Sequence, residues 1–572
     1  MRLVQQGVLG AGAFDDVGRP TGVFLNAEGT ILAVAGHFSG RQWHGRDVWD
    51  GRQLTHRVSV YEAASLRRIA FLDRVRHPIN YVAFHPRCPI LAIAAGSYDG
   101  GYTYGGELIL WDFESGGSVS LLAGSREVVT CRFDDESDAL HLTLRPPIDE
   151  NFWDAERRVN IYPWRGEGLP PQPKKYMRLD TAIPAAAWQR MGERSVDPDT
   201  LPTRFTQVAN ALEMYKRQMA EEIAATLTHF ALGAGQRYTP RWDVWDVAWG
   251  ADDRLLAVRN QTALECWSLE GTLDWHIPDE MNGVQLLLAP DGEYAYVNMH
   301  GGRKRDEEFA KFARTSIVRI WLGSGAVEQL SGIDAPVMLS IARTGHLLAR
   351  DTAREWYRRE EPTLDRIIAS DLTVSGPLDL GGYDLFNHYL RIDGADHLYF
   401  LQGTPPRTHW EEKPRRRASE RKWVCRIEPD TGQVERLFPL EWDSERAGHL
   451  FGGAGCYVCD ARGEGLILAG SLHRAERHHL IVRRALGDGE ALWMVPCESQ
   501  VTAIAYLPQP EIVVFALTGG QLGAIDAQTG ALLDRQQVVA GATGAVPLSL
   551  AGRGNRIAAG LVDGRIALYE WC

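Results

Sequence analysis

Arginine, tryptophan and tyrosine recur in polar segments of this chain that separate short apolar runs. These residue types carry much of the binding energy at protein–protein interfaces, because each combines a large contact area with a polar or charged group. The candidate partner-binding residues are Trp43, Arg46, Tyr102, Tyr104, Trp153, Arg303, Arg305, Trp356, Tyr357, Arg359, Trp410, Arg415, Arg416 and Arg417. The chemistry that they predict is recognition of a protein surface.

The most basic of these segments contains residue types that also bind phosphate or nucleic acid. Residues 413–422 hold six lysines and arginines, but Glu411, Glu412 and Glu420 dilute that charge. The whole chain has a formal net charge of −13, which disfavours non-specific binding to nucleic acid or to an anionic membrane. Nucleic-acid binding through the basic loops is therefore the second alternative to a protein partner.

Two clusters of cysteine and histidine have residue types that ligate metals. Cys456 and Cys459 have CxxC spacing, but no second CxxC pair follows, and a strand there would point the two thiols to opposite sides. The histidines at 473, 478 and 479 stand among arginines, whose charge would repel a cation. P-loop, nucleophile-elbow and HExxH motifs do not occur in the sequence. We therefore predict no catalytic, cofactor-binding or metal-binding residue and no enzymatic activity.

The elements that must position these residues are short strands. Residues 78–124 show a repeating unit, with apolar or alternating runs at 81–86, 90–96, 107–112 and 118–122, bounded by Gly, Pro, Asp or Ser. This pattern is typical of four short strands joined by turns. Polar clusters rich in Gly, Asp and Pro mark the first turn of each unit at roughly 40–70-residue intervals, so about ten units are predicted. In the third unit, residues 159–162 are expected to form the third strand.

This unit resembles a WD40 blade. Its first two strands turn over His85-Pro86, and its third strand ends in Trp111-Asp112 before a Ser-Gly turn. Other units place Tyr, Trp-Ser or Trp-Leu there, and the Gly-His that often precedes a blade is mostly missing. The resemblance implies an all-β fold, a β-propeller of about ten four-stranded WD40-like blades in one large ring or in two rings. It also implies a non-enzymatic platform for complex assembly, although these departures do not support a buried Asp–His network.

The chain also resembles the divergent bacterial propellers that accompany AAA+ ATPases and other proteins in conflict or signalling operons. That resemblance implies a subunit of a bacterial multi-protein system.

The propeller is expected to span residues 1–572, with residues 2–9 supplying the missing fourth strand of the last unit. Closure of this kind would remove an unpaired sheet edge. A helical insertion is expected at 183–241, because apolar residues recur at three- or four-residue steps from 203 to 232. In one interpretation this helix packs on the propeller, and in the other it docks a partner.

Long connections between second and third strands carry the Arg, Trp and Tyr residues. In a WD40-like blade these connections emerge on one face of the disc, and the helical insertion should rise from the same face. A single long loop would be an ordinary tolerated insertion. About seven on one face favour binding, because rigid scaffolds display functional loops in this way.

The start of the chain lacks the apolar stretch of a signal peptide, and no apolar run is long enough to cross a bilayer. Eight cysteines without a disulfide pattern suit a reducing, cytoplasmic compartment. We therefore predict a cytoplasmic scaffold that binds one or more proteins, without a cofactor or a membrane. The first alternative is an enzyme or small-ligand sensor that uses the central channel.

Overall fold

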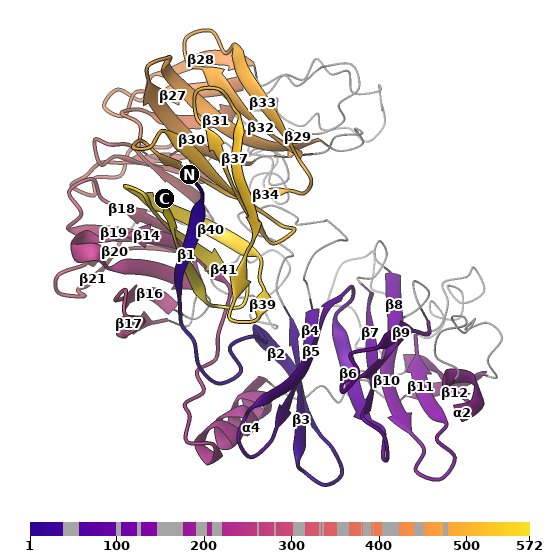
Figure 1. Ribbon diagram of the computed structural model, residues 1–572. Coiled ribbons are helices and arrows are strands. Elements are labelled where there is room, and N and C mark those ends of the chain that lie inside the picture. The colour runs from indigo at the N-terminus through magenta and orange to yellow at the C-terminus, as the bar shows by residue number, and fades with distance from the viewer. Residues whose placement is uncertain are drawn as a thin grey trace, which may run out of the picture. The chain divides into compact units, whose positions relative to one another are not determined.

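The computed structural model describes residues 1–572 except 38–55, 99–103, 123–126, 146–175, 190–202, 209–219, 260–261, 280–281, 301–314, 331–332, 334–336, 352–364, 379, 381–389, 393, 403–422, 440–449, 452 and 473–478. Short antiparallel strands make up nearly all of the regular structure in the described residues (Figure 1). The described residues form two compact units. The larger consists of residues 1–11 and 242–572, and the smaller of residues 12–37 and 56–241.

The larger unit, here called the seven-blade unit, contains seven sheets that follow one another along the chain and are numbered as ring blades 1–7. Ring blade 1 is β14 (Val244–Trp249), β15 (Leu255–Arg259), β16 (Thr262–Trp267) and β17 (Leu273–Pro278), with a 3₁₀ turn η2 (Ala251–Asp253). Ring blade 2 is β18 (Asn282–Leu288), β19 (Tyr294–His300), β20 (Thr315–Trp321) and β21 (Val327–Gln329). Ring blade 3 is β22 (Val337–Ile341), β23 (Leu347–Asp351) and β24 (Arg366–Ile368).

Ring blades 4–7 continue the same order. Ring blade 4 is β25 (Leu390–Arg391), β26 (Leu398–Gln402), β27 (Trp423–Ile427) and β28 (Val434–Pro439), in which β25 pairs in parallel with β30 of the next blade. Ring blade 5 is β29 (Leu450–Phe451), β30 (Gly453–Asp460), β31 (Gly463–Leu472), β32 (His479–Ala485) and β33 (Ala491–Cys497). Ring blade 6 is β34 (Val501–Leu507), β35 (Ile512–Leu517), β36 (Gln521–Asp526) and β37 (Leu532–Gln537), followed by the hairpin β38 (Val539–Ala540) and β39 (Thr543–Gly544). Ring blade 7 is β40 (Pro547–Arg553), β41 (Arg556–Leu561), β42 (Ile566–Trp571) and β1 (Leu3–Leu9).

The hydrophobic core of the seven-blade unit runs in a closed circle. Each of its seven clusters is shared by two neighbouring ring blades, from blades 1 and 2 through to blades 6 and 7. The seventh cluster joins ring blade 7 to ring blade 1, where Ile566 and Ala558 pack with Val244 and Leu255. Since every sheet is covered on both faces, a strand can be apolar throughout, as in β35, whose residues are all buried. The predicted all-β propeller fold is therefore confirmed.

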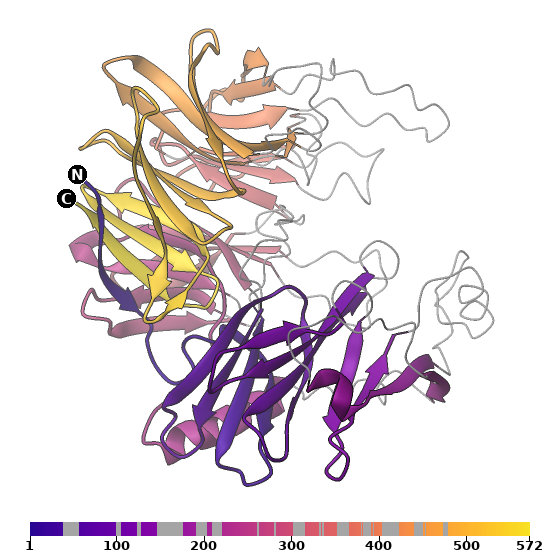
Figure 2. The same cartoon turned by 45° about the vertical axis from the view of Figure 1, so that its right-hand side comes forward.

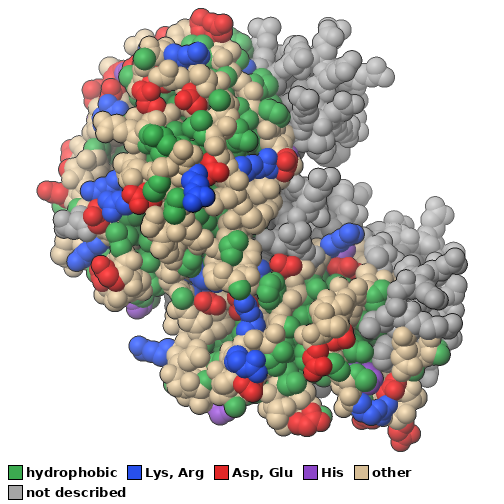
Figure 3. Space-filling model, viewed as in Figure 1, with side chains coloured by type: hydrophobic (Ala, Val, Ile, Leu, Met, Phe, Trp, Pro, Cys, Tyr) green, Lys and Arg blue, Asp and Glu red, His purple; other side chains and the backbone are tan. Residues whose placement is uncertain are grey.

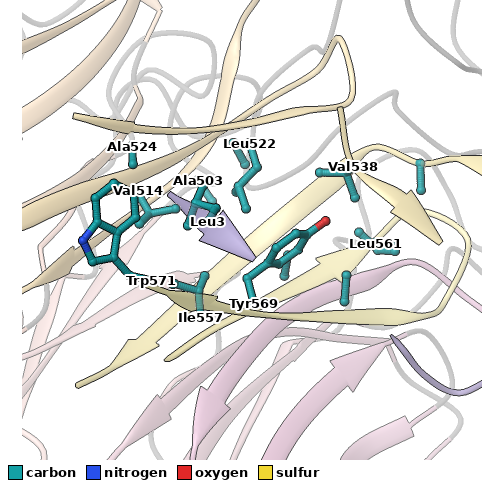
Figure 4. Packing of buried hydrophobic residues seen from close by; sticks show 14 of the residues in the cluster. Leu3, Ala503, Val514, Leu522, Ala524, Val538, Ile557, Leu561, Tyr569 and Trp571 are labelled. Atoms are coloured by element: carbon teal, nitrogen blue, oxygen red, sulfur yellow. The ribbon is translucent and has the colours of Figure 1, made fainter. Parts of the chain in front are cut away.

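Strand β1 comes from the start of the chain but lies in the last sheet. It pairs antiparallel with β42, from Leu3 opposite Trp571 to Leu9 opposite Ile566. Leu3 packs among the side chains of ring blades 6 and 7, close to Tyr569 and Trp571 (Figure 4). Leu9 lies in the other cluster, between ring blades 7 and 1. The two interfaces of ring blade 7 therefore both depend on this strand.

The smaller unit, here called the three-blade unit, has three sheets and two helices (Figure 2). Its first blade is β2 (Arg19–Leu25), β3 (Ile31–His37), β4 (His56–Glu62) and β5 (Arg68–Val75). The second blade is β6 (Ile79–Phe84), β7 (Ile90–Tyr98), β8 (Tyr104–Asp112) and β9 (Ser118–Ser120). The third blade is β10 (Val128–Phe133), β11 (Leu140–Leu144), β12 (Tyr176–Ile183) and β13 (Thr203–Val208), and the helices are α2 (Ala185–Trp188) and α4 (Ala220–Gly233).

Helix α4 covers the face of the first blade that no other sheet covers among the described residues. Along β3, Ala33 and Ala35 face the second blade, whereas Leu32 and Val34 face the helix. This alternation follows the two-residue period of a strand. The far face of the third blade carries polar residues such as the exposed Arg132 and His141, as expected of the terminal unit in an array of repeats. Both ends of this three-blade array thus avoid exposing a large apolar face.

One prediction for the region after the second blade is wrong, and another falls outside the described residues. Residues 203–208 were expected to begin a helix, but they form β13, which pairs with β12 along six residues. The three-residue spacing of Phe205 and Val208 favours a helix, but pairing with the open edge of β12 decides the structure. The third strand of this blade is β12, whereas the expected strand at 159–162 lies outside the described residues. A helix is present from Ala220 to Gly233 within the insertion predicted at 183–241.

We expect Leu227→Ala in α4 to lower the free energy of unfolding of the three-blade unit by about 2–5 kcal/mol, because its side chain is fully buried against the first blade. Leu232→Ala in the same helix is the matched control, since that side chain is 66% exposed. Urea unfolding measures the loss, and hydrogen exchange in β2 and β3 localises it. Equal effects of the two substitutions would contradict this packing.

Candidate interaction face

Successive strands of a blade run in opposite directions, so every connection between a second and a third strand lies at the same edge of its blade. We call it the loop edge, and the opposite edge, with the tight turns, the turn edge. In the seven-blade unit, the segments 301–314, 352–364, 403–422 and 473–478 join second to third strands. In the three-blade unit, 38–55, 99–103 and 146–175 do the same. Within each unit, the inserted segments therefore start and end on one edge.

Thirteen of the fourteen predicted partner-binding residues belong to these inserted segments, and Tyr104 directly follows one of them. The same thirteen lie outside the described residues. Tyr104 is the first residue of β8, and its backbone pairs with Tyr98 of β7 at the loop edge of the second blade. The described structure thus shows where the segments are anchored.

Helix α4 does not offer its apolar side to a partner. Ile223, Leu227 and Ala231 are buried against the first blade of the three-blade unit. The interpretation in which this helix packs on the propeller is the correct one. A partner that contacts α4 would meet its polar side, which includes the exposed Glu221 and Glu222.

A buried ion pair holds the two ends of segment 352–364 together. Arg350, next to the end of β23, donates to the Asp365 carboxylate at 3.0 Å, and their side chains are 6% and 0% exposed. The other carboxylate oxygen of Asp365 accepts the backbone N–H of Asp351 at 2.9 Å. The described residues on the two sides of the segment are therefore held together by buried hydrogen bonds and an ion pair.

A second carboxylate, Asp16, binds β4 and β5 in the first blade of the three-blade unit. Its Oδ2 accepts hydrogen bonds from Ser59 at 2.7 Å and Arg68 at 3.0 Å, and Tyr61 donates to Oδ1. Burial would raise the pKa of Asp16, but the hydrogen bonds from Tyr61 and Ser59 and the arginine charges outweigh it, so its pKa lies below the ordinary value. Asp16 is therefore ionised, and its hydrogen bonds hold β4 and β5 in place.

Buried pairs of an arginine and a carboxylate also occur at the loop edge of other blades. Arg259 pairs with Glu265 at 2.6 Å and donates to the backbone carbonyl of Gly564, in the neighbouring ring blade, at 2.9 Å. Arg565 pairs with Asp563 at 2.6 Å and donates to the carbonyl of Ala540 at 2.9 Å. Buried arginine–carboxylate pairs thus tie blades to one another.

The residues that carry the WD40 resemblance have a local role here. Asp112 accepts the backbone N–H groups of Glu114 and Ser115 at 3.0 and 3.1 Å, so it caps the turn that follows β8. The ring of His85 lies 3.4 Å from the carboxylate of Asp138, in the turn between β10 and β11. Asp112 therefore stabilises the turn after its own strand, whereas His85 contacts a residue of the next blade.

One arginine crosses the middle of the seven-blade unit. Arg391 of β25, in ring blade 4, forms an ion pair with Asp246 of β14, in ring blade 1. It also donates to the carbonyl of Leu286 in β18 at 2.8 Å. Asp246 in turn accepts the backbone N–H of Leu286 at 2.9 Å. Because blades 1 and 4 are not neighbours, this side chain must reach across the ring, and the polar groups there satisfy one another.

The two cysteines singled out in the sequence differ in burial. Cys456 of β30 is buried, whereas Cys459 of the same strand is exposed. His473 and His478 lie outside the described residues, and His479 begins β32. Within the described ranges, no group of three His, Cys, Asp or Glu side chains is placed to hold a metal ion. Helices long and apolar enough to cross a membrane are also absent from those ranges.

Comparisons with known proteins add little to this geometry. No protein-family model and no curated protein matches the chain. Among solved structures, a chain from a crystal structure of the mitotic checkpoint complex is similar over 57% of this chain and 87% of its own length. The TM-score is 0.38 and the identity is 11%. The propeller fold of this chain therefore rests on its own strand pairing and core.

Proposed function

We propose that the chain is a non-enzymatic scaffold that binds one or more proteins through its loop edges. The observation that carries the proposal is the shared position of the inserted segments between second and third strands. The sequence places Trp, Tyr and Arg in those segments, which is the composition of interface hot spots. The buried Arg350–Asp365 pair that flanks segment 352–364 supplies a rigid base there, so less ordering is needed when a partner binds.

The wider setting that we propose is a cytoplasmic, bacterial multi-protein system with a role in conflict or signalling. A protein partner fits the charge better than nucleic acid does, because the net charge is −13. On the face in view, acidic and basic side chains are interspersed over the described surface (Figure 3). Arg415, Arg416 and Arg417 are proposed to contact an acidic region of the partner.

The test uses the tagged full chain, purified gently from its native cell, with mass spectrometry of co-purifying proteins. We expect a stoichiometric partner with the unchanged chain and its loss after Arg415, Arg416 and Arg417 are all replaced by Glu. The charge control is Arg67→Glu with Arg343→Glu, since these side chains lie in turn-edge turns and are 68% and 58% exposed. Retention of every partner by the triple variant would refute this role for the arginines. A salt-sensitive gel shift that the same variant loses would make the chain a nucleic-acid binder instead.

A further inference from the structure

A groove of about 880 Å³ opens between ring blades 1 and 2, at the turn edge. Its walls come from the first turns of the two blades, from the turn between β20 and β21, and from the outer strand β17 (Figure 1). The inserted segments of the loop edge take no part in it. The groove is therefore a surface separate from the proposed interaction face.

The floor and walls of the groove are apolar and well supported. Leu256 and Cys266 form the floor and are each 1% exposed, while Trp275 and Trp321 stand half-buried at the sides. The Trp321 ring is held from behind, because the Tyr294 ring lies at 5.2 Å and the guanidinium of Arg319 at 5.0 Å. Indole rings fixed in this way offer large contact areas at little entropic cost.

Glycines keep this space open. Gly292 and Gly325 line the groove at backbone φ angles of 73° and 69°. Only glycine adopts such angles readily, so the turns can be tight and carry no side chain into the groove. The groove is therefore open at these two turns because their glycines have no side chain to fill it.

One wall of the groove is a strand with an open edge. β17 pairs with β16 on one side, and no described strand pairs with its other side. Trp275 and Ile277 alternate with exposed neighbours and both line the groove. An extended segment that adds beside β17 would gain backbone hydrogen bonds and place every second side chain in the groove.

The charges around the groove favour a cationic occupant. Glu293 lines it, is exposed, and forms no ion pair with any described residue. The single arginine of the lining, Arg254, is already offset by Asp274 at 3.6 Å. Asp291 stands beside Gly292 on the same turn and is also exposed. Beside the first turn of ring blade 1, Arg553 and Arg556 share the carboxylate of Asp253. Glu293 and Asp291, on the first turn of ring blade 2, are therefore the carboxylates that can meet a cationic occupant.

We propose that this groove docks an extended segment of a partner protein in which apolar side chains alternate with lysine or arginine. The segment adds as a strand beside β17. Its apolar side chains lie between Trp275 and Trp321, and the basic side chains that alternate with them point away from the groove. A basic side chain beyond the paired part of the segment, at the turn edge, meets Glu293. This gives the seven-blade unit a second docking surface, on the edge opposite to the inserted segments.

Fluorescence anisotropy with the full chain tests the proposal. The probe is a short fluorescein-labelled peptide that alternates leucine with lysine, and its matched control has glutamate at each lysine. We expect the basic peptide alone to bind, and Glu293→Lys to weaken it about fivefold or more. Trp275→Ala should weaken it about tenfold, with urea unfolding as the check on folding. Glu490→Lys, an exposed carboxylate in a turn of ring blade 5, is the control and should bind as the unchanged chain does.

Two outcomes would overturn the proposal. One is equal binding of the acidic and basic peptides, and the other is equal affinity for Glu293→Lys and Glu490→Lys. A basic peptide with N-methyl groups on alternate amides tests the added strand, because it lacks the donors that pair with β17. Undiminished binding of that peptide would refute strand addition. None of these results depends on Arg415–Arg417, so the groove and the loop edge can fail independently.

Discussion

Arg483→Ala is expected to lower the free energy of unfolding of the seven-blade unit by about 3–5 kcal/mol. Arg483 lies on β32, and its side chain and that of Asp460 are both 0% exposed. Its two terminal nitrogens both donate to the Asp460 carboxylate, one of them at 2.8 Å, and Nη1 also donates to the carbonyl of Ala527 at 2.8 Å. Ala527 belongs to ring blade 6, so one side chain joins two blades. Its removal leaves the Asp460 carboxylate buried without its charged partner, and the backbone N–H of Arg462, at 2.9 Å, still donates to it.

Chemical denaturation measures the loss, and Arg426→Ala is the matched control. Arg426 also pairs with a glutamate, Glu435, but those side chains are 33% and 56% exposed. Exposed pairs contribute roughly 0–1 kcal/mol. A loss as small for Arg483→Ala as for Arg426→Ala would contradict the structural role. Replacing both partners, as in Arg483→Met with Asp460→Leu, should recover most of the stability, because no charge is then left buried.

The loss should also depend on pH. The hydrogen bonds from Arg483 lower the pKa of Asp460 below its ordinary value, although burial opposes this. A carboxylate with a lowered folded-state pKa stabilises the fold above its unfolded-state pKa of about 4, and this stabilisation is lost as the pH falls through the folded-state pKa. The difference between the unchanged chain and Arg483→Ala is therefore expected at neutral pH and should shrink in acid. A difference that grows as the pH falls would show that the sign is wrong.

Local features of the fold could be predicted from the sequence because they depend on neighbouring residues. The polar clusters rich in Gly, Asp and Pro predict the first turn of each unit, and the turns so formed include Gly29, Gly292 and Gly345, each with a positive φ angle. Glycine adopts such an angle readily, so the residue type alone indicates the turn. The alternating and continuous apolar runs between the turns likewise predict strands.

The buried ion pairs could not be predicted in this way, because their partners meet only after folding. Arg350 and Asp365 form one such pair, and the length of the insertion between them does not follow from the blade pattern. Arg391 and Asp246 form another, and they stand 145 residues apart in the sequence. The same limit explains the misplaced helix at 203–208, where an open sheet edge decided the structure. The candidate partner-binding residues stay predictions, since thirteen of the fourteen lie outside the described residues.

Deletion of residues 1–9 is expected to be the most damaging change to the seven-blade unit. Without β1, the edge of β42 is unpaired, and an open strand edge promotes aggregation. Leu3 and Leu9, 3% and 2% exposed, leave two different clusters at once. Removal of a buried leucine side chain costs about 2–5 kcal/mol. Two such losses approach the whole stability of a typical domain, which is about 5–15 kcal/mol.

The deletion also breaks links between β1 and ring blade 6. The backbone N–H of Leu3 donates to Asp534 at 2.7 Å, and Gln536 donates to the Leu3 carbonyl at 3.1 Å. We therefore expect the shortened chain to aggregate in size-exclusion chromatography and to unfold at lower urea concentration. Gln6→Ala is the control, because Gln6 is exposed and lies at the bulge where the pairing register shifts. A peptide of residues 1–11 added to the shortened chain should restore part of the stability. If the shortened chain unfolds at an unchanged urea concentration, ring blade 7 is stable with three strands and β1 is not what closes the circle of clusters.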